Sequence, residues 1–165
     1  MSRAVLSLGS NLGDRLGYLR LAVFGFGDAV RAISPVYETA PWGVTDQGDF
    51  LNAILIVDDP DVDEWGWLRR GQQLEQDAHR ERIQRWGPRT LDVDVVTVDG
   101  VTSTDPELLL PHPGTPTRAS VLVPWHDIEP DAQLAGHGPI AHLLTTLDPA
   151  DVAGVRRTDL SLVVA

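Results

Sequence analysis

The chain has 165 residues, of which 42% are hydrophobic and 22% charged, a composition typical of one soluble globular domain with a substantial core. It has no cysteine, so disulfides, thiolate catalysis and thiolate metal sites are excluded. The formal net charge of -11 argues against a nucleic-acid partner, and no apolar run approaches the roughly 18 residues of a membrane span. Because residues 1–30 lack the pattern of a secretion signal, we expect a cytoplasmic location and no membrane partner.

All 13 basic residues are arginines, and six of them gather in one segment: Arg69, Arg70, Arg80, Arg82, Arg85 and Arg89. A basic segment in an acidic chain suggests a pocket for a small anionic ligand. The alternative is a helix with a solvated arginine face, and we assign Arg69 and Arg70 to such a face. The absence of lysine excludes a Walker-type phosphate loop.

The chain opens with the pattern of a strand, a turn and a helix. Residues 4–8 are apolar and predict a strand that enters a turn at residues 9–11. Asp14 then offers an N-cap, and apolar residues recur at helical spacing until Gly25 and Gly27 end the pattern.

Two further strands are predicted on either side of a long loop. Residues 33–39 read as a strand that Pro35 confines to an edge or a bulge, and residues 40–49 form the loop. Residues 50–57 predict a clear strand, with Asn52 at its entrance. A buried amide at that place must find polar partners, and a heterocyclic ligand could supply them.

The most informative segment is residues 85–94, a cationic and aromatic loop followed by two aspartates. It comes after a helical pattern over residues 62–78 and leads into a strand over residues 91–98. The strand period of two puts Asp92 and Asp94 on one face, and magnesium is usually held by one or two carboxylates together with substrate phosphates. A plain strand with two solvated acids is the alternative, but its flanks, with valines that require burial opposite the acids, argue against it.

The last third of the chain has weaker signals. The dipeptide at residues 99–100 predicts a tight turn, and residues 121–124 are a further short apolar segment. Pro139 opens a short helix, and residues 160–164 predict a closing edge strand. The order β-α-β-β-α-β favours an α+β ferredoxin-like sandwich, an antiparallel sheet with helices on one face and extra C-terminal elements. The opposite sheet face is then left for loops and ligand to cover.

Four stretches of the chain, in order, carry a family resemblance: Leu8 to Asp14, Tyr37-Glu38-Thr39 through Asp49 to Ala53, Arg85 to Asp94, and Pro111-His112 with Arg118. Together they resemble the 6-hydroxymethyl-7,8-dihydropterin pyrophosphokinase family of folate biosynthesis. The third stretch is highly specific, and the others support it. The resemblance implies a single domain over residues 1–165 that moves the β,γ-pyrophosphoryl group of ATP to the hydroxymethyl oxygen of the pterin, releasing AMP. We expect it to act as a monomer.

The resemblance also implies roles for individual residues. Asp92 and Asp94 would hold two magnesium ions, and Arg80 and Arg89 would contact the transition state. The ATP-binding set would be Gln72, Glu75, Arg82, His112 and Arg118. The pterin pocket would consist of Thr39, Ala40, Trp42, Phe50, Asn52 and Trp86.

The chain departs from the family at three positions. Ser120 stands where members often carry a second aromatic that stacks on the pterin, and Pro113 stands where a tyrosine is sometimes found. His79 stands where glycine commonly precedes the loop arginine. Two other functions compete with the resemblance: a ferredoxin-like small-molecule sensor, which would have no use for the paired acids, and a magnesium-dependent phosphohydrolase, which would have no use for the pterin pocket.

Overall fold

The computed structural model describes residues 2–40, 47–79 and 90–163 of the chain. The first half contains β1 (Ser2–Ser10), α1 (Arg15–Phe26), the short 3-10 turn η1 (Gly27–Ala29), β2 (Val30–Ile33), β3 (Tyr37–Thr39), β4 (Phe50–Asp59) and α2 (Glu64–Asp77). The second half contains β5 (Asp92–Val98), β6 (Ser103–Asp105), β7 (Leu108–Leu110), η2 (Thr115–Thr117), α3 (Ala119–Ile128), β8 (Gln133–Leu134), β9 (Gly138–Pro139), α4 (Ile140–Thr146), α5 (Pro149–Ala153) and β10 (Arg156–Arg157). Among the described residues, none of the helices has the length and apolarity that crossing a membrane requires.

The main sheet has the strand order β10-β3-β4-β1-β5, and β2 also pairs with β4. Every neighbouring pair in it is antiparallel, which confirms the predicted antiparallel sheet. The long central strand β1 pairs with β4 over its whole length, from Ser2 opposite Asp59 to Ser10 opposite Leu51. This pairing fixes which residues of the three strands β4, β1 and β5 share a face.

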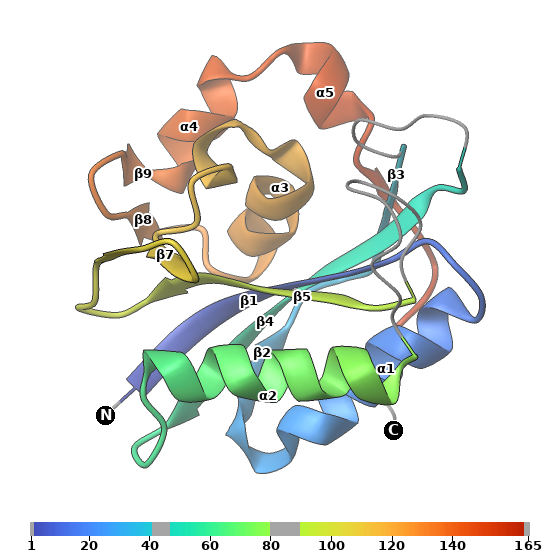
Figure 1. Ribbon diagram of the computed structural model, residues 1–165. Helices are drawn as coiled ribbons and strands as arrows, with labels where there is room; N and C mark the ends of the chain where they lie inside the picture. Colours follow the sequence, from blue (N-terminus) through green and yellow to red (C-terminus); the bar gives the residue numbers. More distant parts are fainter. Residues whose placement is uncertain (1, 41–46, 80–89, 164–165) are drawn as a thin grey trace.

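Helices α1 and α2 cover one face of this sheet, as Figure 1 shows. Asp14 caps α1 through its side chain, which accepts a hydrogen bond from the N–H of Gly17, so the predicted cap is confirmed. The helix ends at Gly27, where φ is +54°, whereas Gly25 lies inside it. A Cβ on Gly25 would lie 2.3 Å from Leu74 Cδ2, so this glycine lets the two helices pack closely.

The opposite face of the sheet is also covered by helices, and the prediction that helices lie on one face is wrong for the C-terminal third. There α3 and α4 pack over one half of the face (Figure 1). The short apolar segment at residues 121–124 belongs to α3, with Pro124 inside the helix. These helices and the sheet form a second core cluster: Val5, Ile54, Ile56, Val96, Val121, Leu122, Trp125, Ala132, Leu134, Ile140 and Leu143.

The strand predicted over residues 33–39 is two short strands, β2 and β3, and both pair with β4. Ser34 separates them: its N–H donates to the carbonyl of Ile54 at 2.9 Å, and its hydroxyl accepts from the N–H of Ile54 at 2.8 Å. Pro35 cannot donate to the sheet, so the interruption falls where the proline predicted a bulge.

The end of the chain also differs from its prediction. Residues 160–163 form no strand, and Arg156–Arg157 (β10) takes the edge position beside β3 instead. The predicted turn at residues 99–100 is confirmed, with Gly100 at φ +73° and a bridge between Val98 and Val101. The helix that Pro139 opens is confirmed as well.

His79 has a left-handed backbone, with φ +58°, just after the end of α2. Glycine adopts this conformation without the steric cost that a Cβ adds, so His79→Gly is expected to raise the free energy of unfolding by about 0.5–1 kcal/mol. The matched control is His142→Gly, which places glycine at an exposed position inside α4 and should lower it by about 0.5 kcal/mol. Chemical denaturation of both variants checks the two signs, and a destabilising His79→Gly would contradict the argument.

Candidate active site

One face of the sheet is divided into an apolar half and a polar half. The apolar half lies under α3 and α4, and the polar half lies at the other end of the same three strands. There Gly9 of β1 is the Cα partner of Asn52 on one side and of Asp92 on the other. Two residues along β1, Ser7 is the partner of Asp94. The sheet therefore brings an amide and two carboxylates to one surface.

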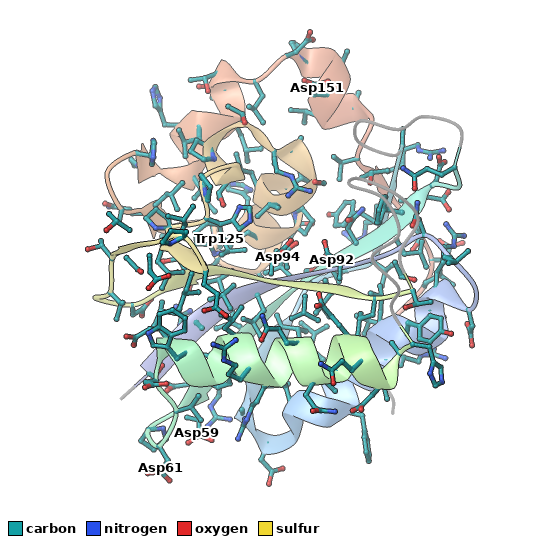
Figure 2. All side chains as sticks on the ribbon, in the orientation of Figure 1. Asp59, Asp61, Asp92, Asp94, Trp125 and Asp151 are labelled. Carbon is teal, nitrogen blue, oxygen red and sulfur yellow. The ribbon has the colours of Figure 1, made fainter. Side chains whose placement is uncertain are left out.

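Asp92 and Asp94 point to the side of β5 that faces α3, as Figure 2 shows. Burial, and then the charge of the Asp92 carboxylate, raise the pKa of Asp94 from 3.8 to about 8. Glu75 adds to this shift, and Arg118 opposes it. Two carboxyl groups that cannot easily ionise together form a site for a cation, since a bound cation favours the ionised form of both.

His112 and Arg118 lie beside the acids on the segment between β7 and α3. The N–H of His112 donates to the carbonyl of Val96 in β5 at 2.8 Å, which attaches this segment to the strand with the two acids. A Cβ on Gly114 would lie 3.1 Å from Arg118 Cδ and 3.8 Å from His112 Nδ1, so the segment folds tightly around that glycine. Burial, and then the charge of Arg118, lower the pKa of His112, and Asp92 acts in the opposite direction.

Asn52 and its neighbours form the other side of the polar half. The Nδ2 of Asn52 donates to the hydroxyl of Thr39 at 2.7 Å, so the amide is held from β3. Phe50, half-buried at the start of β4, lies beside it above Gly9. Ala40, which follows Thr39, is exposed. Thr39, Phe50 and Asn52 are thus brought together, as expected for one pocket.

A network of charged and polar residues holds the chain next to this pocket, and its two arginines, Arg15 and Arg156, were not singled out from the sequence. Arg15 Nη1 donates to Glu38 Oε2 at 2.8 Å and to the carbonyl of Asp49 at 3.0 Å. Arg156 of β10 pairs with Asp49 at 2.9 Å. The Nδ2 of Asn11 donates to Gln47 and to the carbonyl of Gly48. The turn predicted at residues 9–11 includes Asn11, but no pattern in the sequence indicated the role of Arg156.

The two predicted ATP ligands on α2 belong to the helix that covers the other face of the sheet. Glu75 is buried, and its Oε2 accepts a hydrogen bond from the N–H of Val93 at 2.9 Å, between the two aspartates. Gln72 is half-buried, and its Oε1 accepts a hydrogen bond from Arg69 Nη1 at 2.9 Å. Glu75 therefore contacts the strand that carries the acids, whereas Gln72 contacts the helix surface.

Five predicted site residues lie outside the described residues: Trp42, Arg80, Arg82, Trp86 and Arg89. All three departures from the family are described, and His79 is the residue with the left-handed backbone after α2. Ser120 is half-buried in the first turn of α3, and Pro113 directly follows His112. A separate hollow at the start of α2, lined by residues such as Asp61 and Gly66, holds none of the predicted site residues.

A polar sheet surface with paired carboxylates and a neighbouring arginine is typical of a metal-assisted enzyme for phosphate-containing substrates. The comparisons with known proteins give the particular family. The chain belongs to the 7,8-dihydro-6-hydroxymethylpterin-pyrophosphokinase (HPPK) family, whose model matches residues 5–130.

Curated relatives carry the name 2-amino-4-hydroxy-6-hydroxymethyldihydropteridine pyrophosphokinase. The protein of Mycobacterium tuberculosis is 50% identical over 94% of this chain and 89% of its own length. The protein of Mycobacterium leprae is 49% identical over 98% of this chain and 92% of its own length. A more distant relative from Bacillus subtilis is 37% identical over 76% of this chain and 77% of its own length.

Solved structures support the fold. The wild-type HPPK-DHPS of Plasmodium falciparum aligns with a TM-score of 0.66 at 13% identity, over 88% of this chain and 44% of that one. An HPPK-DHPS in complex with substrates aligns with a TM-score of 0.68 at 13% identity. This chain covers 43% of that second protein, so it spans less than half of both longer chains.

The raised pKa of Asp94 makes stability depend on pH in a defined direction. Between about pH 4 and pH 8 the unfolded chain releases the Asp94 proton while the folded chain keeps it, so the free energy of unfolding falls as the pH rises through this window. Asp94→Asn removes this loss. Without divalent cations the variant is expected to unfold at a higher temperature than wild type at pH 8 and at a similar one at pH 4, with each kcal/mol worth about 2–4 °C.

Thermal unfolding in EDTA from pH 4 to pH 9 measures this difference, and the exposed Asp131→Asn serves as the control for loss of one surface charge. A gap between Asp94→Asn and wild type that does not widen with pH would contradict the pKa of Asp94.

The hydrogen bond from the N–H of Val93 to Glu75 predicts that stability depends on an acceptor at residue 75 more than on its charge. Glu75→Ala leaves a buried N–H without its acceptor and should lower the free energy of unfolding by about 1–3 kcal/mol. Glu75→Gln keeps an oxygen acceptor and should lose less than half of that. Denaturant unfolding compares the two with Asp77→Ala, an exposed acid on the same helix. Equal losses in both Glu75 variants would refute this role of the acceptor.

Proposed function

We propose that this chain transfers the β,γ-pyrophosphoryl group of ATP to the hydroxymethyl oxygen of 6-hydroxymethyl-7,8-dihydropterin, as a step of folate biosynthesis. The hydroxymethyl oxygen forms a bond to the β-phosphorus and gives up its proton, and the bond from the β-phosphorus to the α,β-bridging oxygen breaks. AMP leaves with that oxygen. Family membership and the names of the curated relatives support this proposal.

The observation that carries the proposal is the cross-strand row of Asn52, Gly9 and Asp92. It places a residue suited to a heterocycle next to a residue suited to a metal-bound phosphate. A reaction between a pterin and ATP needs these two functions side by side, because alignment of the two substrates accounts for much of such catalysis. A plain phosphohydrolase needs only the second function.

The described residues fit magnesium. Asp92 and Asp94 offer oxygen ligands only, and the described residues contain no group of three or more histidine, cysteine or acidic side chains that could hold a metal. Magnesium in enzymes of this type is commonly held by one or two carboxylates and by substrate phosphates, so the pair suffices. We propose that Asp92 and Asp94 hold two Mg²⁺ ions, which when bound neutralise phosphate charge and orient the attacking hydroxyl.

The residues around the acids would bind the two substrates. His112 and Arg118 lie where ring N–H and guanidinium groups can donate to phosphate oxygens, and the lowered pKa of His112 favours its neutral form. Thr39, Ala40, Phe50 and Asn52 would bind the pterin ring. The proposal extends to residues outside the described ranges: Arg80 and Arg89 at the transition state, Arg82 on ATP, and Trp42 and Trp86 on the pterin. We also propose Gln72 and Glu75 as ATP-binding residues, and the contact of Glu75 with β5 supports its part.

The central strands have the order β3-β4-β1-β5, and along the chain α1 follows β1 and α2 follows β4. This arrangement supports a ferredoxin-like β-α-β-β-α-β sandwich, to which α3 and α4 are added. We propose that residues 1–165 act as one pyrophosphokinase domain and as a monomer.

Product analysis with ATP, magnesium and the hydroxymethyl pterin tests the proposal. AMP and pyrophosphorylated pterin are expected in equal amounts, and ADP, or phosphate without a pterin product, would refute it. Asp94→Asn is expected to lose at least about a hundredfold in turnover, because charge stabilisation of several kcal/mol is lost. Unfolding measurements on the same sample show whether the variant is folded, and near wild-type turnover would refute the metal role.

A further inference from the structure

Gly9 is a glycine in the central strand of the sheet, at a place where the protein has room for a side chain. A Cβ there would lie 3.4 Å from Phe50 Cδ1 and 3.5 Å from Asn52 Oδ1, which are ordinary van der Waals distances. Gly9 has no positive φ, and it pairs regularly with Asn52 and Asp92. Neither the backbone nor the packing of the described residues therefore requires glycine at this position.

Other glycines of the fold show the contrast. A Cβ on Gly25 would lie 2.3 Å from Leu74, and a Cβ on Gly71 would lie 2.9 Å from Val93, so both are needed for helix packing. Glycine in a strand is destabilising relative to alanine, and it often marks a place where a ligand approaches the backbone closely. Gly9 shows no such packing requirement, so close approach of a ligand is a reason that can apply there.

The groups on either side of Gly9 indicate what approaches it. The Nδ2 of Asn52 is used by Thr39, whereas the Oδ1 of Asn52 and the ring of Phe50 are the groups nearest to a Cβ on Gly9. On the other side lies Asp92, two strand spacings or roughly 9.5 Å from Asn52 across the sheet. A ligand over Gly9 can therefore donate an N–H to Asn52 at one end and reach the carboxylates at the other.

We infer that Gly9 is a specificity-determining residue, whose bare backbone lets a flat pterin ring and its hydroxymethyl arm lie between Asn52 and Asp92. The inference rests on the proposed function and adds the surface on which the two substrates meet. A methyl group at Gly9 occupies the space of about one substrate carbon. It thereby lifts or shifts the ring and moves the hydroxyl away from the phosphate, while the acids stay in place.

Gly9→Ala tests this directly. The variant is expected to unfold at the same temperature as wild type or higher, and to bind a non-hydrolysable ATP analogue with magnesium within about twofold of wild type. Its kcat/KM for the pterin should fall by at least about tenfold, the usual effect of one misplaced carbon in a pocket. The matched control is Gly154→Ala, where a Cβ would also lie 3.4 Å from its nearest neighbours but outside the sheet. Gly154→Ala should change neither the affinity for the ATP analogue nor the kcat/KM for the pterin.

The outcomes separate the inference from the function on which it rests. A folded Gly9→Ala with wild-type kcat/KM for the pterin overturns the inference alone. A wild-type protein that forms no pterin product overturns the proposed function and the inference with it. Should Gly9→Ala fail to fold, the amide resonance of Gly9 in ¹⁵N-labelled wild type decides: it should shift when the pterin is added to the complex with the ATP analogue, while that of Gly154 stays. An unmoved Gly9 resonance overturns the inference.

Discussion

The register of β4, β1 and β5 is the constraint on which the rest of the structure depends. Because side chains alternate along each strand, this register sends one set of residues to each face. On the face toward α3 it aligns an apolar block, Val5, Ile54, Ile56 and Val96, and a polar block, Gly9, Asn52, Asp92 and Asp94. A slip by one residue in any of the three strands would bury carboxylates and expose valines, so the core and the site specify the same pairing.

The C-terminal helices connect the second core to the site. Helix α3 buries Val121, Leu122 and Trp125 against the apolar block, and Arg118 is the residue directly before its first turn. The guanidinium of Arg118 favours the charged form of Asp94. Burial of α3 therefore determines where this guanidinium lies relative to the two acids. The position of Arg118 is therefore set by hydrophobic packing, which is less sensitive to salt than a surface ion pair is.

The sequence predicted the parts of the fold that depend on local pattern. The paired acids were found because a strand period is visible over a few residues, and α1 was found because Asp14 is a local cap. Helix α3 was missed because residues 121–124 are too short to distinguish a helix from a strand and Pro124 argues against a helix. The role of Arg156 joins residues more than a hundred positions apart, so no local pattern could show it. The same holds for the second helical layer, which depends on contacts with distant strands.

The site places three acidic groups around one strand end, and each has a different consequence. Glu75 has a donor, the N–H of Val93, so its burial contributes to the position of β5. Asp94 instead has Asp92 as its neighbour, and the raised pKa of Asp94 shows that the folded protein disfavours their joint ionisation. A ligand that binds only the folded state stabilises it by mass action, and a cation at this pair also removes the repulsion. The surface thus gives up stability in the free protein to create affinity for a cation. Glu75 supplies part of the coupling between cation binding and folding, because its hydrogen bond to Val93 holds the backbone between Asp92 and Asp94.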